Sequence, residues 1–242
     1  MNTKRQRLGQ HYLVDPDVVR RIVSTAKIGP GEKVLEIGTG RGTLTRELKA
    51  VSGALEGYEV DPLNFKETVT RAGGRNVSLH LADAFRAKPI FDVLVSSLPY
   101  SRSADFVEWL SQMKYDRAVV LLQEDFVQKI ASPPGSRNYR AVSAIAQIAS
   151  AIRLGEAVGR EAFSPMPRVD SRITTFLPKR RLRMSEVDLI KRLFTLRRRT
   201  LSAALALTGI VPTVMPRNPG ERVYRLSPTE VYEIVADAKS RA

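Results

Sequence analysis

Cysteine is absent from this chain of 242 residues, and histidine occurs only twice, at His11 and His80. Without cysteine the protein has no disulfide bonds and no thiolate metal ligands. The two histidines lie far apart in the sequence, and no cluster of carboxylates accompanies either of them. We therefore expect a function that does not depend on a bound metal.

Long apolar runs are also missing. No stretch approaches the roughly 20 apolar residues that a membrane-spanning helix needs, and the segment 1–7 lacks the apolar core of a secretion signal. Hydrophobic residues nevertheless make up 43% of the chain, which is enough to build a buried core. The sequence is typical of a globular protein, for which we expect a cytoplasmic location.

Acidic residues are scarce relative to basic ones. The chain holds 25 Asp and Glu against 39 Lys and Arg, a formal net charge of +14. Residues 179–242 alone hold 14 Lys and Arg against 6 Asp and Glu. Because phosphate neutralisation dominates the affinity of proteins for nucleic acids, this balance indicates a polyanionic partner. The basic clusters at 179–181 and 197–199 are the expected phosphate contacts, since a merely solvated helix face usually interleaves more acids.

Short apolar runs recur along the first two thirds of the chain at a spacing typical of alternating strands and helices. This alternation predicts an α/β, Rossmann-like fold around a parallel sheet. The expected strands are 33–38, 54–60, 77–81, 91–96 and 117–122, with a late strand at 172–177. The expected helices are 15–27, 43–51, 105–113, 124–130 and 138–151.

From about Leu182 onward the pattern becomes wholly helical. Helices are expected at 185–194, 200–207 and 227–237, and the segment 212–220 between the last two is rich in Pro and Gly. We therefore expect two domains, an α/β domain over 1–180 and a small, basic, all-helical domain over 181–242.

A glycine-rich turn containing Gly38 and Gly40 follows the first expected strand, and the amides of the next helix would face a ligand there. Glu59 ends the second strand, where its carboxylate is placed to hold ribose hydroxyls. Asp83 follows the third strand and can accept from an adenine amine. Since open α/β sheets bind ligands at the carboxyl ends of their strands, these residues predict a nucleoside cofactor.

Ser97, Leu98, Pro99 and Tyr100 form a polar, apolar, proline, aromatic tetrad at the end of the fourth strand. Methylation of an exocyclic amine on a nucleobase requires such a grip, because the lone pair of that amine is delocalised into the ring. Tyr100 would stack on a flipped base, while the Ser97 hydroxyl and the Leu98 carbonyl accept the hydrogens of the amine. An NAD-dependent dehydrogenase would use the glycines and Glu59 but would explain neither the tetrad nor the basic tail. S-adenosylmethionine as cofactor accounts for all of these features.

These motifs, in this order, resemble those of the ribosomal RNA adenine dimethylase family, and the resemblance spans nearly the whole chain. The matching segments are 8–13 near the N-terminus, the glycine turn 36–42, the ribose motif 59–61, the adenine motif 83–84, the tetrad 97–100, the proline-rich segment 163–171 and the basic segment 193–201.

The resemblance implies transfer of methyl groups from S-adenosylmethionine to the N6 amines of two adjacent adenosines near the 3′ end of small-subunit rRNA, within ribosome biogenesis. It implies that Phe163 faces Tyr100 across the target adenine and that the basic C-terminal domain binds RNA. We expect the partner to be a pre-ribosomal particle and the protein to be a monomer. The cofactor site implied by the resemblance is lined by His11, Leu13, Gly38, Gly40, Glu59, Asp83 and Ser97.

Two residues depart from the family pattern. Ser97 stands where the family usually has Asn, and its shorter side chain leaves open a second hypothesis, an rRNA-binding ribosome-assembly factor with weak or absent methylation. His11 also replaces an Asn, and a titratable ring there introduces a pH dependence that Asn lacks. Two further alternatives rank lower: the antibiotic-resistance branch that methylates large-subunit rRNA, and a DNA adenine methyltransferase.

Overall fold

The computed structural model describes residues 11–213, 217–236 and 238–240. Contacts between residues divide the chain into two compact units. Unit 1 comprises Met1–Phe106, Lys114–Val127 and Arg153–Pro178, and unit 2 comprises Val107–Met113, Gln128–Ile152 and Lys179–Ala242. Two segments that precede residue 180 thus group with the C-terminal part. The two domains proposed from the sequence, with a boundary at 180, stay a prediction.

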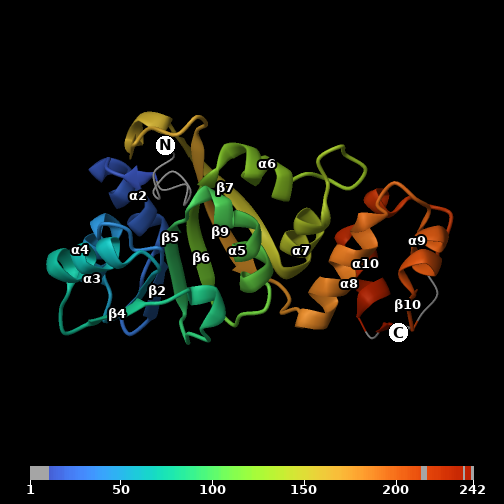
Figure 1. The fold of residues 1–242 in the computed structure, drawn as a ribbon, viewed down its shortest axis with the longest axis horizontal. Coiled ribbons are helices and arrows are strands. Elements are labelled where there is room, and N and C mark those ends of the chain that lie inside the picture. The colour runs from blue at the N-terminus through green and yellow to red at the C-terminus, as the bar shows by residue number, and fades with distance from the viewer. Residues whose placement is uncertain (1–10, 214–216, 237, 241–242) are drawn as a thin grey trace. The chain divides into compact units, whose positions relative to one another are not determined.

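A mixed sheet forms the centre of the α/β fold, with the strand order β4-β3-β2-β5-β6-β9-β7 in the described part of the chain (Figure 1). Five neighbouring strands are parallel, as the spacing predicts, and their bounds agree with the prediction to within two residues. These strands are β2 (Lys33–Ile37), β3 (Ala54–Glu59), β4 (Val77–Leu81), β5 (Val93–Ser97) and β6 (Arg117–Gln123). The predicted α/β fold is therefore confirmed.

At its far end the sheet departs from the parallel arrangement of these five strands. The late strand, β9 (Ser171–Pro178), pairs antiparallel with β6, and β7 (Ser150–Val158) lies beside β9 at the sheet edge. The sequence pattern extends a helix to residue 151, but that helix ends at Ala149, where the chain enters β7. Pairing with β9 outweighs local helix propensity there, because strand formation depends on cross-strand neighbours.

Helices separate the strands along the chain. Their bounds are α2 (Pro16–Ala26), α3 (Thr43–Val51), α4 (Pro62–Ala72), α5 (Ser103–Leu110), α6 (Glu124–Ile130) and α7 (Ala141–Ala149). The predicted start of the first helix is confirmed, since the Asp15 carboxylate accepts from two backbone N–H groups of the first turn and Pro16 follows it. Helix α4 was not predicted, although Asp61 and Pro62 give it the same kind of start.

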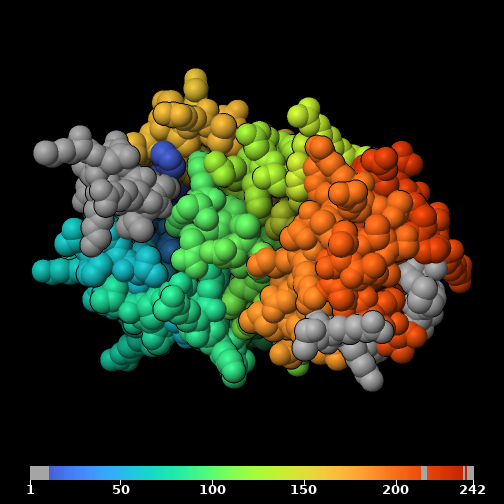
Figure 2. All heavy atoms as spheres, turned by 45° about the vertical axis from the view of Figure 1, so that its right-hand side comes forward, coloured from blue at the N-terminus to red at the C-terminus, as the bar shows by residue number. Residues whose placement is uncertain are grey.

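Unit 2 is mainly helical, and its helices α8 (Met184–Thr195), α9 (Leu201–Thr208) and α10 (Pro228–Val235) match the predicted ones closely. Their side chains pack closely, in orange to red in Figure 2. Tyr139 and Phe194 meet edge to face in this core, with ring centroids 5.6 Å apart. The C-terminal part is not wholly helical, because the short strands β10 (Ile210–Val211) and β11 (Lys239–Ser240) pair with each other.

Smaller elements complete the chain. Two-residue strands β1 (Tyr12–Leu13) and β8 (Phe163–Ser164) pair antiparallel. Short 3₁₀ turns lie at Ala84–Arg86, Tyr100–Arg102, Arg160–Ala162 and Val223–Arg225. Among the residues described, no helix combines the length and apolar character needed to cross a bilayer.

Arg117, the first residue of β6, ties the sheet to the connection between α2 and β2. Its guanidinium donates to both carboxylate oxygens of Glu32, at 2.8 and 2.6 Å. It also donates to the carbonyls of Ala26 and Lys27 at the end of α2. The bonds from Arg117 and from the Gly29 N–H lower the pKa of Glu32 to about 2. This ion pair therefore stabilises the fold wherever Glu32 is ionised.

We predict that Glu32→Gln lowers the free energy of unfolding at pH 7 by about 1–2 kcal/mol, because it removes a paired, partly buried carboxylate. The folded pKa lies below the ordinary value of 4.5, so the stabilisation is present above that pH and is lost as the pH falls toward about 2. Urea unfolding of both proteins between pH 7 and pH 2.5 measures the difference. As a control, Glu47→Gln removes the exposed partner of Arg46 and should change stability little. A constant difference across the acid range would contradict the assignment.

Candidate functional site

The carboxyl ends of β2, β3, β4 and β5 meet at one edge of the sheet and border a pocket. In the strand order β2 lies between β3 and β5, so the chain runs outward from this point in both directions. Such a switch in strand order is where open α/β sheets bind ligands. The described residues that line the pocket all belong to unit 1.

The glycine-rich turn forms one wall of this pocket. Gly38 and Gly40 have φ angles of 75° and 56°, in the left-handed region where residues other than glycine are strained. The N–H of Gly38 donates to the carbonyl of Tyr58 at 2.8 Å, which continues the pairing of β2 with β3 into the turn. Helix α3 begins directly after the turn, so its first amides lie at the pocket.

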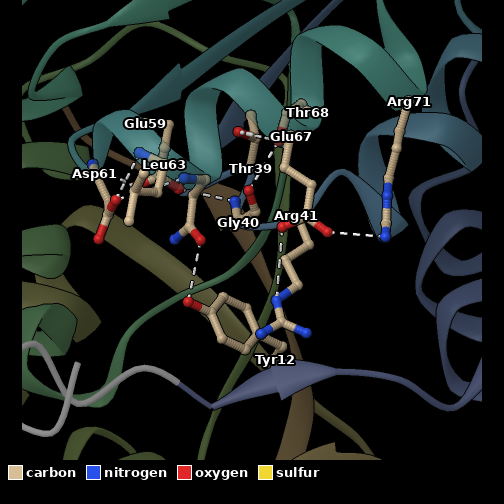
Figure 3. Close-up of polar contacts among 11 residues, drawn as sticks. Tyr12, Thr39, Gly40, Arg41, Glu59, Asp61, Leu63, Glu67, Thr68 and Arg71 are labelled. Atoms are coloured by element: carbon tan, nitrogen blue, oxygen red, sulfur yellow. Dashed lines mark hydrogen bonds and ion pairs between the residues drawn. The ribbon is translucent and has the colours of Figure 1, made fainter.

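Glu59, at the end of β3, fixes the glycine turn in place (Figure 3). Its Oε2 accepts from the Gly40 N–H at 2.8 Å, and its Oε1 accepts from the N–H groups of Val60 and Asp61 at 2.9 and 2.8 Å. Burial raises the pKa of this carboxyl, and the three N–H bonds oppose that rise. An ionised carboxylate offers about four acceptor positions, so Oε2 retains one for a ligand in the pocket.

Tyr12 lies against the other side of the glycine turn (Figure 3), and the sequence analysis missed its role. Its hydroxyl donates to Asn64 Oδ1 at 3.1 Å, and the guanidinium carbon of Arg41 lies 4.4 Å from its ring centroid. A side chain at Gly40 would approach the Tyr12 ring to 3.4 Å. Tyr12 stands in the sequence between His11 and Leu13, which are both predicted cofactor residues, and this position was the signal that indicated a place in the pocket.

Glu36, near the end of β2, is the most deeply buried acid of the pocket lining, with 1% of its surface exposed. Neither of its carboxylate oxygens has a hydrogen-bond partner in the part of the chain that the structure describes. Burial raises the pKa of Glu36 to about 8, and the charge of Glu59 adds to the rise. Glu36 is therefore mostly protonated at neutral pH. Glu36 belongs to the glycine motif 36–42, but its residue type and position predicted no role for it.

Asp83 lies in the pocket lining, just after β4. Its Oδ1 accepts from the Phe85 N–H at 3.0 Å, and its Oδ2 accepts from Arg102 Nη2 at 3.2 Å. The side chain is 25% exposed. Its remaining lone pairs are available to the exocyclic amine that the sequence assigns to it.

The tetrad occupies the end of β5 and the turn that follows. Ser97, Leu98 and Pro99 line the pocket, and Tyr100 begins the 3₁₀ turn Tyr100–Arg102. The Tyr100 hydroxyl shares a hydrogen bond with Ser171 Oγ at 2.8 Å. Partial burial raises the pKa of this phenol, which keeps it neutral.

Segments distant in sequence come together around Tyr100. Strand β1 pairs with β8, with Leu13 opposite Phe163. His11 Nδ1 lies 2.7 Å from the Pro165 carbonyl, to which it donates, and the His11 ring lies 5.4 Å from that of Tyr100 at 35°. The predicted partner of Tyr100, Phe163, is 4% exposed and meets Tyr100 edge-on, with centroids 6.4 Å apart.

His11, and not Phe163, thus presents the more nearly parallel ring to Tyr100 in this structure. The two-walled base site formed by Tyr100 and Phe163 stays a prediction. All seven predicted cofactor residues lie together in the pocket lining: His11, Leu13, Gly38, Gly40, Glu59, Asp83 and Ser97. Residues 8–10 of the N-terminal motif lie outside the described residues.

We predict that replacement of Glu36 by Gln flattens the dependence of stability on pH. The folded pKa of about 8 exceeds the ordinary value of 4.5, so the folded protein holds a proton that the unfolded chain has released. The wild-type free energy of unfolding should therefore fall between about pH 5 and pH 8 relative to Glu36→Gln, by at most about 1.4 kcal/mol per pH unit. Thermal unfolding across this range measures the difference. Parallel pH profiles for the two proteins would contradict a buried, protonated Glu36.

Known proteins with similar sequences and structures place these features in a family. The family model described as ribosomal RNA adenine dimethylase matches residues 1–235. A protein of Thermococcus gammatolerans called probable ribosomal RNA small subunit methyltransferase A is 34% identical, over 94% of this chain and 86% of its own.

Two solved structures share the fold. A dimethyladenosine transferase from Plasmodium falciparum superposes with a TM-score of 0.79 at 23% identity, over 94% of this chain and 97% of its own. The 23S rRNA methyltransferase ErmE superposes with a TM-score of 0.67 at 23% identity, over 93% of this chain and 98% of its own. Because the family match runs from the glycine turn through the tetrad into the basic C-terminal helices, this chain belongs to the ribosomal RNA adenine dimethylase family.

Proposed function

We propose that this protein dimethylates the N6 amines of two adjacent adenosines near the 3′ end of small-subunit rRNA, with S-adenosylmethionine as methyl donor. Membership of a family of S-adenosylmethionine-dependent rRNA methyltransferases supports the reaction class. The observation that carries the proposal is the tetrad 97–100, which ends β5 directly beside the pocket at the switch point.

The pocket residues fit S-adenosylmethionine in kind and in order. Glu59 keeps an acceptor position for a ribose hydroxyl, and Asp83 keeps lone pairs for the adenine amine. The glycine turn lets a ligand approach the backbone closely, because Gly38 and Gly40 carry no side chain and line the pocket. The unpartnered, buried carboxyl group of Glu36 is a further polar group for a ligand in this pocket.

The chain's own contribution to the reaction is orientation. When bound, S-adenosylmethionine supplies an electrophilic methyl group for the adenine amine. Tyr100 stacks on the flipped base, and the Ser97 hydroxyl and Leu98 carbonyl accept the amine hydrogens, which frees the nitrogen lone pair from the ring. No strong base is required, because the amine proton becomes acidic only as the new bond to carbon forms. The rate gain therefore comes mainly from proximity and alignment.

The basic C-terminal residues support an RNA substrate. The clusters 179–181 and 197–199 each consist of three consecutive basic residues. Burial lowers the pKa of Arg197, and the charges of Arg140 and Arg198 lower it further because like charges disfavour the protonated form. We propose that these clusters hold rRNA phosphates of a pre-ribosomal particle, and that the protein acts as a monomer during ribosome biogenesis.

Small-subunit rRNA is the favoured target. Two relatives named as probable ribosomal RNA small subunit methyltransferase A are 34% and 35% identical over nearly the whole of this chain, which supports that target. The assembly-factor hypothesis remains as the alternative, because Ser97 is shorter than the usual Asn of the family.

Methyl transfer tests the proposal directly. Small ribosomal subunits that lack these modifications are incubated with the protein and labelled S-adenosylmethionine, and the digested RNA is analysed by mass spectrometry. Adjacent N6,N6-dimethyladenosines near the 3′ end are the expected product. Monomethyl product alone would indicate a site that stalls after one transfer. Binding without any product, repaired by Ser97→Asn, would favour the assembly factor.

We predict that Tyr100→Ala mainly lowers kcat, whereas Glu59→Ala mainly weakens cofactor binding. Loss of the stacking ring should lower kcat by about 5- to 150-fold, since stacking on an aromatic ring contributes ~1–3 kcal/mol per base. Loss of the Glu59 carboxylate should instead raise the Kd for S-adenosylmethionine by about 10-fold or more, because charged hydrogen bonds are lost. Isothermal titration and initial rates separate the two effects.

Two matched variants control this comparison. Tyr100→Phe keeps the ring and loses only the bond to Ser171, so it should retain most activity. Glu56→Ala removes a carboxylate from the same strand that lies outside this pocket, bound to Tyr58, and should leave cofactor affinity nearly unchanged. Normal cofactor binding by Glu59→Ala would show that the cofactor assignment is wrong.

A further inference from the structure

Arg102 lies two residues after Tyr100, and its guanidinium group contacts Asp83 of the predicted cofactor site. Its Nη2 donates to Asp83 Oδ2 at 3.2 Å, and its Nε donates to Asp105 Oδ2 at 2.9 Å. The guanidinium carbon also lies 4.7 Å from the centroid of the Phe85 ring. Three neighbours from two segments of the chain therefore hold this group at the edge of the pocket.

The Asp83 carboxylate is fixed from both sides by these contacts. Oδ1 accepts from the Phe85 N–H of its own turn, and Oδ2 accepts from Arg102. About half of its acceptor positions remain, so the pair with Arg102 leaves room for an adenine amine. Arg102 thus orients the carboxylate rather than blocking it.

The same short turn carries both Arg102 and Tyr100. The 3₁₀ turn Tyr100–Arg102 is closed by the Arg102 N–H donating to the Pro99 carbonyl at 2.9 Å. The Ser103 hydroxyl donates to the Tyr100 carbonyl at 3.1 Å, which fixes the following residue. The turn therefore connects the ion pair of Asp83 with Arg102 to the backbone that carries Tyr100.

We propose that Arg102 is a positioning residue that couples occupancy of the cofactor's adenine site to the placement of Tyr100 at the target base. This inference rests on the proposed function. The Arg102 and Asp83 side chains are 35% and 25% exposed, and an ion pair so open to water contributes little. An adenine ring beside Asp83 excludes that water and strengthens the pair, because the local dielectric constant falls.

The consequence is positive and reciprocal coupling between cofactor and RNA. A ligand at Asp83 holds the Tyr100 turn in one position, and RNA bound to that turn in the same position favours the ligand equally. A pair that served stability alone would change the melting temperature without changing this coupling. The coupling factor is therefore the measurement that separates the two roles.

The experiment measures the Kd of unmethylated small ribosomal subunits for the full-length protein with and without saturating sinefungin, a cofactor analogue that transfers no methyl group. For the wild type we expect sinefungin to tighten binding by about 5-fold or more. Arg102→Gln should bring this ratio close to 1, and Arg102→Lys should restore part of it. Arg86→Gln is the matched control, because Arg86 is exposed on the neighbouring turn Ala84–Arg86 and should keep the wild-type ratio.

Asp83→Asn gives an independent arm should Arg102→Gln fail to fold. It removes the carboxylate charge from the other side of the pair, so it should also bring the ratio of Kd values close to 1. The double variant of Arg102→Gln and Asp83→Asn should show the same ratio as each single variant. A wild-type ratio in folded Arg102→Gln, or in Asp83→Asn, overturns the inference. If the wild-type protein methylates subunits but its ratio of Kd values is 1, the inference alone is overturned. If the wild-type protein binds no sinefungin, the proposed function is overturned as well.

Discussion

The hydrogen bonds of the Glu59 carboxylate are the constraint on which the pocket depends. A buried carboxylate is tolerated only when donors replace its lost water, and three backbone N–H groups do so here. One of those donors is Gly40, so the same bonds fasten the glycine turn to the end of β3. Tyr12 then packs on the fixed turn, and Asn64 and Arg41 hold Tyr12. The shape of the pocket thus follows from one side chain at a strand end.

Three acids line this pocket, and their surroundings give them different states. Burial without hydrogen-bond partners keeps Glu36 largely protonated at neutral pH. Glu59 is also buried, but its backbone donors favour the ionised form. Asp83 is partly exposed and faces a guanidinium. Carboxyl groups therefore supply a neutral group, a fixed acceptor and an ion-pair partner within a single site, because the pKa of a carboxyl follows its solvation and neighbours.

The target-base side of the site is assembled from segments that are far apart in the chain. Tyr100 follows β5, whereas His11 and Phe163 come from the short strands β1 and β8 or directly beside them. Two residues of pairing on each strand bring these rings together. Because His11 also bonds the Pro165 carbonyl, the N-terminal segment and the proline-rich segment are held against the tetrad turn as one arrangement.

The sequence by itself determined the α/β alternation, the helix starts at Asp15 and Ser227, and the clustering of Gly38, Glu59, Asp83 and Ser97, because periodicity, caps and strand ends are local properties. Only the tertiary structure decided the antiparallel β9, the strand β7 that replaces the end of a helix, and the partners of Tyr12 and Arg102. Those features depend on contacts between residues remote in the chain. Burial and distance between such residues are set by packing, which no local pattern contains.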